Sequence, residues 1–442
     1  MRLTLVGGIG GWMPASWYIV RMDIVAFLGR VTEFYVDSEG FNGLPAPSAG
    51  LDMGELRQLI RPLVESGQLY VNYGDRHPNP HILAFDPEPV DEQLLKLDEG
   101  DLESACLYPT VACLRTVVDP ADYEGRPYAL ELALGYPVLG YHFFDLSILE
   151  SYRNDPRYYY TFDIDGMISV ANEHYEQPTM DKRDQVLLQT FGLALAKDKY
   201  WAIVVFRRYL SMLSPEHQQM WKAKQEPDDP DLYQPHRDYW RMSMGEWPEK
   251  MSLFTAFLLE MEQVNRLAEI IGRPQLFRNT YHDERPRDFG YLIRPTAREL
   301  ANFAGVLDKM LSDNIDRKFF QNDVPYEDET TDGKGRTIVT QRGTIRILEE
   351  WVKVKARLKN EDSQKLVDQA ITTLKDIRKA RNPQAHKIGV DAYDIELFKE
   401  QIKMLRDAYR AMVTLRQLLK LHPAAKDYVV PEELEEMQVL DF

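Results

Sequence analysis

Cysteine is scarce in this sequence: 442 residues contain only two, Cys106 and Cys113. So few cysteines exclude a disulfide scaffold and a four-cysteine zinc site, and their spacing is not that of a CxxC redox pair. We therefore expect both to be buried hydrophobic side chains. His77 and His81 flank a short turn, but a metal site would need further ligands near them. We predict that the chain binds no metal and uses no cofactor.

Long apolar runs are also missing. No stretch of about 18 apolar residues occurs, so the sequence predicts no membrane span. The N-terminal segment has one arginine followed by a mostly apolar run, as a signal peptide does. That run contains four glycines and a proline, and it lacks an A-x-A-like cleavage site. Nothing later in the sequence needs an oxidising compartment, so we expect a cytoplasmic protein.

Positive charge is in deficit. The chain has 53 lysines and arginines against 70 aspartates and glutamates, for a net charge of −17. This balance excludes a protein that coats nucleic acid or an anionic membrane through bulk charge. The deficit is uneven, because residues 291–420 carry about 25 basic and about 20 acidic side chains, whereas 1–290 and 421–442 are acidic. A local nucleic-acid site within 291–420 is therefore compatible with the composition.

The length indicates two or three domains, and the first region, residues 1–145, is mixed α+β. A helix is expected over 53–65 and short strands over 69–73 and 81–85. A helix followed by a hairpin is the shape of the second half of a winged helix. Because this helix carries two arginines and two glutamates, a role in protein contact is favoured over DNA reading.

Residues 146–290 are predicted to form a helical middle domain. Apolar side chains recur at helical spacing over 182–197 and over 248–271. Between them, the proline- and aspartate-rich segment 224–238 is expected to be a loop.

Motifs of phosphoryl chemistry in this part of the chain fail on inspection. FDIDG (162–166) contains the DxDG of haloacid-dehalogenase phosphatases, but aromatic residues precede it and Met167 follows it, which favours an aromatic β-turn. HRD (236–238) and DFG (288–290) occur without the glycine-rich loop and lysine that a protein kinase needs.

Residues 291–425 have the most regular pattern. Thr296 and Glu299 form a capping box that opens the first helix. Further helices are expected over 344–358, 362–381 and 394–421, with the polar segment 322–336 as a loop. The predicted fold is therefore mainly α and multidomain, with a C-terminal antiparallel four-helix bundle, a mixed α+β N-terminal region and an acidic tail over 426–442.

One motif survives, RNPQAH at 381–386, at the end of the third bundle helix. Here the sequence resembles the HEPN superfamily, four-helix-bundle proteins of which many are metal-independent ribonucleases. Their hallmark is an arginine, often followed by a polar residue, and then a histidine after four to six intervening residues. Arg381, Asn382 and His386 match this pattern, and the resemblance covers about 125 residues.

Two other Arg–His pairs have similar spacing, Arg76–His81 and Arg416–His422. The first falls in an expected turn, and the second begins deep inside the fourth helix. Arg381 differs because it follows an apolar stripe of helical spacing, Leu366, Ala370, Leu374 and Ile377. A guanidinium placed there needs a partner, and two are open: a carboxylate or helix-end carbonyl, which is structural, and a phosphate, which is functional.

The resemblance implies a ribonuclease in which the RNA 2′-OH attacks the neighbouring phosphorus without metal. His386 would then serve as general base or acid, and Arg381 would stabilise the charge that develops on the phosphate. Asn382 would orient His386 or the phosphate. The family's site is shared across a two-fold interface, which implies a homodimer through the C-terminal bundle and RNA as the substrate.

Enzymes of this type often act as toxins or anti-phage defence effectors, and residues 1–290 would then bind a regulatory protein or ligand. Two rivals stay open. One is a non-catalytic HEPN-like module that binds a nucleotide or a protein, with Arg381 and His386 as structural groups. The other is a transcription regulator that uses the winged-helix-like segment.

Overall fold

The computed structural model divides into two compact units, each described here by itself. The first contains residues up to Pro120 together with Glu131–Val138, and the second contains Ala121–Leu130 and Leu139–Phe442. The structure describes residues 23–38, 41–73, 88–175, 180–197, 200–247, 250–331, 333–356, 361–381, 391–435 and 439.

The first unit packs helices on a small antiparallel sheet of order β1-β3-β2. Its buried core includes Phe27, Leu56 and Leu107. The strands are β1 (Leu44–Pro45), β2 (Leu69–Asn72) and β3 (Cys106–Pro109), and the helices are α1 (Ile24–Asp37), α2 (Met53–Glu65), α3 (Val90–Glu99) and α4 (Val111–Val117).

Helix α2 has the predicted bounds. Asp52 caps it by accepting hydrogen bonds from the backbone N–H groups of Gly54 and Glu55, and Gly67 ends the turn behind it with a φ of 68°. The strand expected at 69–73 is confirmed as β2, which pairs with β3. The other expected strand, 81–85, lies outside the described residues together with His77 and His81, so the winged-helix-like interpretation stays a prediction.

The second unit contains an antiparallel sheet of order β4-β8-β7-β6-β5, with β9 paired to β7. The strands are β4 (Tyr141–Phe144), β5 (Tyr158–Phe162), β6 (Asp165–Val170), β7 (Leu187–Ala196), β8 (Tyr200–Phe206) and β9 (Tyr233–Pro235). The short helices around them are α6 (Glu150–Arg153), α7 (Asn172–Tyr175), α8 (Arg207–Ser211), α9 (Pro215–Lys222) and α10 (Arg237–Ser243). Helix α5 (Pro127–Ala133) contributes residues to both units. The aromatic turn expected at 162–166 is confirmed, because β5 and β6 form a hairpin there.

Residues 146–290 are therefore mixed α+β rather than a helical domain. The helix predicted over 248–271 is confirmed as α11 (Leu253–Ile270), but the one predicted over 182–197 is wrong, because most of it is strand β7. The reason is that β7 is a central strand whose middle, residues 191–194, is buried on both faces. Leu188 and Leu193 pack in one core, whereas Ala194 and Ala196 pack in the other. A strand buried on both faces has no clear alternation, so its apolar residues also fit helical spacing. The expected loop 224–238 likewise contains β9.

Gly192 in β7 is a position where the sheet leaves no room for a side chain. A Cβ built there would lie 2.2 Å from the ring of the buried Tyr239. We expect Gly192→Ala to lower the free energy of unfolding by about 1–3 kcal/mol, because the ring must move. Gly305, inside α12 with open space around it, is the matched control. Gly305→Ala should instead raise it by up to about 1 kcal/mol. Urea denaturation measures both, and shifts of the same sign would contradict this account of Gly192.

Long helices make up the rest of the second unit. They are α11 (Leu253–Ile270), α12 (Ala297–Asp308), α13 (Thr344–Lys355), α14 (Glu361–Ala380), α15 (Glu396–Lys420) and the short α16 (Glu432–Glu435). The predictions at 344–358, 362–381 and 394–421 are confirmed with small differences at the ends. Thr296 caps α12 as expected, but Glu299 accepts from the N–H groups of Ile293 and Arg294 rather than from Thr296.

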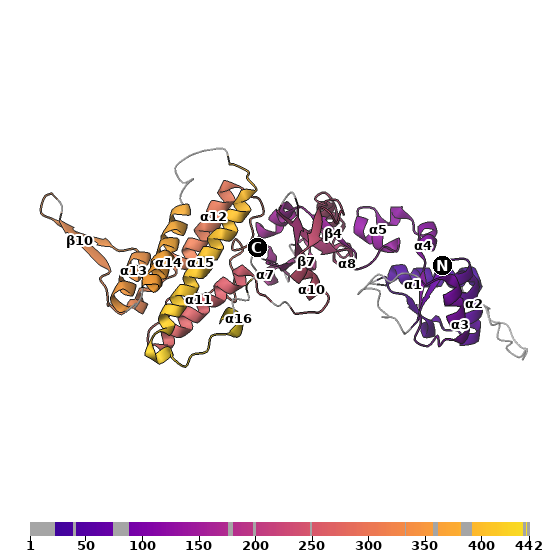
Figure 1. Cartoon of the computed structure of the whole chain (residues 1–442). Coiled ribbons are helices and arrows are strands. Elements are labelled where there is room, and N and C mark those ends of the chain that lie inside the picture. The colour runs from indigo at the N-terminus through magenta and orange to yellow at the C-terminus, as the bar shows by residue number, and fades with distance from the viewer. Residues whose placement is uncertain are drawn as a thin grey trace, which may run out of the picture. The chain divides into compact units, whose positions relative to one another are not determined.

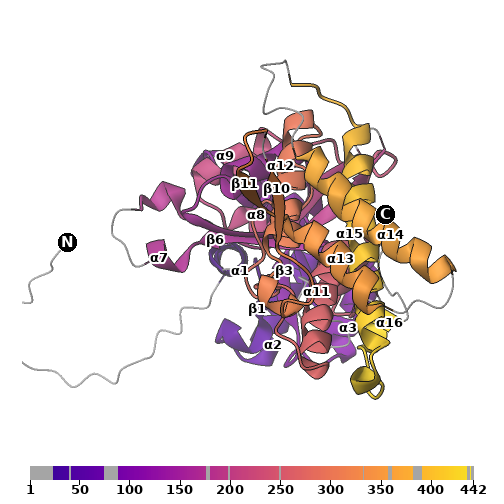
Figure 2. The same ribbon diagram turned by 90° about the vertical axis from the view of Figure 1, so that its left-hand side faces the viewer.

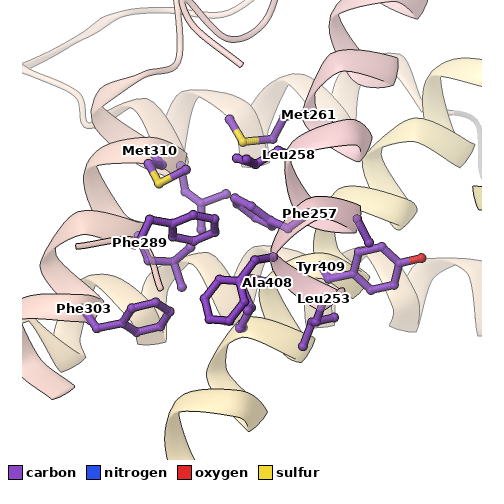
Figure 3. Close-up of a cluster of buried hydrophobic side chains, with 14 of the residues drawn as sticks. Leu253, Phe257, Leu258, Met261, Phe289, Phe303, Met310, Ala408 and Tyr409 are labelled. Atoms are coloured by element: carbon purple, nitrogen blue, oxygen red, sulfur yellow. The ribbon is translucent and has the colours of Figure 1, made fainter. Parts of the chain in front are cut away.

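Helices α14 and α15 lie side by side, α11 packs along α15, and α12 packs on α14 (Figure 1, Figure 2). Phe257 and Met261 of α11 meet Phe289, Phe303 and α15 in one buried cluster (Figure 3).

Because the second unit contains an antiparallel sheet as well as these helices, the fold class is mixed α+β rather than the predicted mainly α. The predicted domain boundaries at 145, 290 and 425 stay predictions. In the described residues, no helix has the length and apolar character that crossing a membrane requires.

The segment expected to be a loop at 322–336 instead forms much of a two-stranded arm. Strands β10 (Glu327–Thr331) and β11 (Thr337–Gln341) pair antiparallel, and the arm extends away from α13 (Figure 1). Nearly all of its strand residues are exposed. Because neither face is buried, the segment shows no apolar alternation, which is why its composition indicated a loop.

Candidate functional site

The RNPQAH motif begins directly after α14, which ends at Ala380. The backbone N–H of Arg381 still donates to Ile377 O at 3.3 Å, so Arg381 continues the last turn. Asn382 and His386 lie outside the described residues. Arg381 is therefore the one predicted site residue whose surroundings the structure gives.

The apolar stripe that leads to Arg381 is largely as predicted. Ala370, Leu374 and Ile377 are buried, but Leu366 is 55% exposed and Val367 is buried in its place. The stripe drifts because steps of four residues overshoot the helical repeat of 3.6. Arg381 thus lies at the end of the buried face of α14.

The partner of Arg381 is the carboxylate of Asp308, the last residue of α12. The Arg381 Nη1 atom lies 2.6 Å from Asp308 Oδ2. The Asp308 side chain is 1% exposed and that of Arg381 is 35% exposed, so the pair spans the boundary between core and solvent. The carboxylate partner considered from the sequence is therefore present.

Asp308 is itself fixed by a local irregularity. The helix continues past it as a π-helical turn, Lys309–Asp313, and the Ser312 hydroxyl donates to both the carboxylate and the carbonyl of Asp308. Thr344 at the start of α13 donates its hydroxyl to Ser312 O at 2.6 Å. Short π-helical turns are frequent at functional sites. This one joins three elements behind the guanidinium of Arg381.

The geometry leaves part of the guanidinium available. Arginine has five N–H donors, and one atom of this group, Nη1, bonds Asp308. Among the described residues, Nε and Nη2 of Arg381 have no hydrogen-bond partner, and the side chain keeps a third of its surface in solvent. Such an arrangement holds a cation in one orientation and can present its remaining donors to an anion.

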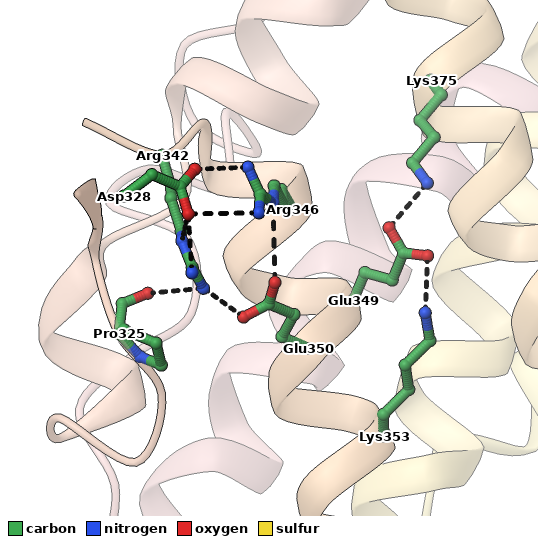
Figure 4. Close-up of polar contacts among 8 residues, drawn as sticks. All are labelled: Pro325, Asp328, Arg342, Arg346, Glu349, Glu350, Lys353 and Lys375. Carbon is green, nitrogen blue, oxygen red and sulfur yellow. Dashed lines mark hydrogen bonds and ion pairs between the residues drawn. The ribbon is translucent and has the colours of Figure 1, made fainter. Parts of the chain in front are cut away.

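The lysines and arginines around the motif are mostly neutralised locally. Glu349 bonds both Lys353 and Lys375, and at the base of the arm Asp328 and Glu350 bond Arg342 and Arg346 (Figure 4). Further on, Lys355 pairs with Asp323 and Lys379 with Asp376. In the part of the chain that the structure describes, Arg378 has no ion-pair partner. Most of the described basic side chains between Arg342 and Arg381 therefore have an acidic partner.

The competing pair Arg416–His422 is structural. Arg416 Nε lies 2.7 Å from Glu260 Oε2 on α11, and both side chains are almost completely buried. Burial raises the pKa of Glu260, and the hydrogen bond from Arg416 partly offsets that rise. His422 accepts a hydrogen bond from the N–H of Ala424 as a cap. Arg76–His81 lies outside the described residues.

The cysteines behave as expected for small hydrophobic groups. Cys113 is buried and Cys106 is half-buried, and burial raises the pKa of both thiols. The described residues contain no group of three or more histidine, cysteine or acidic side chains that could hold a metal ion. The absence of a cofactor stays a prediction.

Sequence analysis missed Asp308, although a signal for it exists. Ala304, Asp308 and Ser312 follow one another at intervals of four, which on a continuous helix places them on one face. A lone carboxylate between small residues on such a face needs a partner of opposite charge, just as the arginine at the end of an apolar stripe does.

Comparison with protein-family models, curated proteins and solved structures found no match.

Proposed function

We propose that this chain is a metal-independent endoribonuclease of HEPN type, with Arg381, Asn382 and His386 as its catalytic residues. The observation that supports this best is the guanidinium of Arg381. It is held from behind by the buried Asp308 and keeps Nε and Nη2 without a partner among the described residues. A planar cation oriented in this way is suited to binding two oxygens of one phosphate.

The reaction would proceed by transfer within the RNA. The 2′-OH attacks the adjacent phosphorus while a base removes its proton, and the 5′-oxygen leaves with a proton from an acid. A histidine near neutral pKa can perform either transfer, which is the role of His386. Arg381 stabilises the charge that builds up on the phosphate oxygens, and Asn382 orients His386 or the phosphate. The products would carry a 2′,3′-cyclic phosphate and a 5′-OH.

Asp308 would act through Arg381 and is a positioning residue. Because its carboxylate is fixed by Ser312, the guanidinium cannot rotate freely toward solvent. The proposal further includes an antiparallel four-helix bundle through which two chains associate, each contributing one Arg–His pair. A role as a toxin or defence effector restrained by residues 1–290 rests on analogy with other enzymes of this type.

The alternative is a non-catalytic HEPN-like module that binds a nucleotide or a protein. One observation favours it: Asp308 already supplies the carboxylate that a purely structural arginine would need. For the transcription-regulator alternative the surroundings of α2 are unfavourable. Arg57 donates to Gly100 O and Arg61 pairs with Asp98, so both arginines are already bonded within the first unit.

Purified protein should cut single-stranded RNA in the presence of EDTA, and His386→Ala should abolish cutting because no other group near Arg381 is proposed to move the proton. Cleavage of a labelled RNA measures this, and thermal unfolding of the same samples serves as the control. An active His386→Ala variant would refute the assignment of His386. A wild-type protein that binds RNA or nucleotide without cutting would favour the non-catalytic module.

A further inference from the structure

A second candidate site lies in the same unit, and Arg381 is not among the residues that line it. The turn between β5 and β6, the start of α11 and the segment 285–291 line a cavity of about 320 Å³. Asp163, in that turn, is its central group. The Asp163 Oδ2 atom accepts hydrogen bonds from the Ser252 hydroxyl at 2.5 Å, from the Thr255 hydroxyl at 3.1 Å and from Arg285 Nη1 at 2.9 Å.

Arg285 is held rigidly beside Asp163. Its guanidinium lies over the rings of Phe254 and Phe289, at 4.7 and 5.4 Å from their centroids, and its Nε donates to Phe289 O at 2.7 Å. These contacts use Nε and Nη1 of the arginine and a single oxygen of Asp163. They account for how the hairpin is fastened to α11, but they do not use the remaining polar atoms of either group.

Three buried polar atoms of the lining residues have no hydrogen-bond partner among the described residues: Asp163 Oδ1, Arg285 Nη2 and Arg153 Nε. Arg153 pairs through Nη1 with Glu299 Oε1 at 2.6 Å, whereas its Nε lies 4.0 Å from Asp288 Oδ1, which is too far for a hydrogen bond. Buried donors and acceptors without partners are unfavourable, so a cavity lined by them is suited to a molecule that supplies the missing partners.

The missing partners define the chemistry of that molecule. Arg285 and Arg153 each offer a donor and require an anionic oxygen, whereas Asp163 offers an acceptor and requires an N–H or O–H group. The lining carries three arginines and two aspartates, and Glu299 pairs with Arg153. The preference for an anion therefore comes from the two N–H donors without a partner rather than from net charge. Its volume lies within the range of small-molecule sites.

We propose that this cavity binds a small dicarboxylic acid that bears an ammonium or hydroxyl group beside one carboxylate, such as an α-amino or α-hydroxy dicarboxylic acid. The two carboxylates meet Arg285 and Arg153, and the neighbouring ammonium or hydroxyl donates to Asp163. This proposal does not rest on RNA cleavage at Arg381. Calorimetry tests it without RNA.

Three probes with the same four-carbon skeleton test the proposal. L-aspartate has an ammonium group, L-malate a hydroxyl, and succinate neither. Titration calorimetry on the full chain should show saturable binding of L-aspartate or L-malate. Succinate should bind at least about tenfold more weakly, because Asp163 Oδ1 then stays without a donor. Whichever of L-aspartate and L-malate binds more tightly shows whether the group that donates to Asp163 is an ammonium or a hydroxyl. Equal affinities for all three, or no binding by any of them, would overturn the proposal.

A variant at Gly290 locates the binding. A Cβ there would lie 3.9 Å from Arg285 Nη2 and 3.7 Å from Phe162 O, which are ordinary contacts, so a side chain fits but covers the free donor. We expect Gly290→Val to abolish binding, and Gly305→Val, at an open position in α12, to leave it unchanged. Unchanged binding in Gly290→Val would place the site elsewhere. The succinate comparison uses the unaltered chain, so it stands whether or not this variant folds.

Discussion

The Arg381→Ala variant is expected to cut RNA about 100- to 1,000-fold more slowly than the unaltered chain, which is the usual effect of removing one donor that stabilises a transition-state charge. Arg381 lies at the end of the buried face of α14 and is oriented by Asp308, so its removal leaves the phosphate without its fixed cation. Initial rates of cleavage of a labelled RNA in EDTA measure the effect.

Lys379→Ala is the matched control for that variant. Lys379 belongs to the same turn, but its side chain is 78% exposed and pairs with Asp376 at 3.0 Å. It should cut at nearly the original rate, because a surface ion pair contributes little. Equal losses in the two variants would mean that Arg381 contributes only general charge.

Two further substitutions separate orientation from charge. Arg381→Lys keeps the positive charge but lacks the planar fork, so it should recover only part of the rate. Asp308→Asn keeps the size of the side chain but weakens its hold on Arg381, so it should lower kcat more than it raises KM. Thermal unfolding of each variant is required, because Arg381→Ala also leaves a buried carboxylate unpaired.

The Arg416→Met variant is expected to lose about 3–5 kcal/mol of unfolding free energy, because it leaves Glu260 buried without its partner. The pair joins α11 and α15, and Glu260 is completely buried. Denaturant titration measures the loss. Arg410→Ala, at an exposed position of the same helix, should change stability by less than about 0.5 kcal/mol. The double variant Glu260→Met/Arg416→Met should recover most of the loss, and failure to do so would contradict the pairing.

The penalty in Arg416→Met should also depend on pH. Burial raises the pKa of Glu260, and the hydrogen bond from Arg416 lowers it, so removing Arg416 raises it further. A carboxyl whose pKa is raised in the folded state gives stability at low pH, which is lost as pH rises through that pKa. The variant should therefore lie closer to the unaltered chain at about pH 5 than at about pH 8. A larger penalty at the lower pH would contradict this.

The C-terminal helices were predictable because their signals are local. Alternating steps of three and four residues and the cap at Thr296 placed α12, α14 and α15 to within a few residues. Strand β7 was not predictable in this way, because its identity depends on β6 and β8 on its two sides. The arm of β10 and β11 was missed for the opposite reason, since it buries neither face.

The candidate site was also predictable only in part. Helix phase singled out Arg381 from the sequence, and the same reasoning applied to α12 would have found Asp308. That the two side chains meet could not be predicted, because 73 residues separate them and the contact depends on how α12 packs on α14. The cavity at Asp163 is further from prediction, since Arg285 stands 122 residues away along the chain.

The central claim, RNA cleavage through the 2′-OH without metal, is tested most directly by the chemistry of the cut ends. Purified protein is incubated with a defined single-stranded RNA in EDTA, and the fragments are identified by mass spectrometry. The account predicts 2′,3′-cyclic phosphate and 5′-OH ends, together with no cut at a position whose 2′-OH has been replaced by hydrogen. Fragments with 3′-OH and 5′-phosphate ends, cutting at the 2′-deoxy position, or no fragments at all would contradict it.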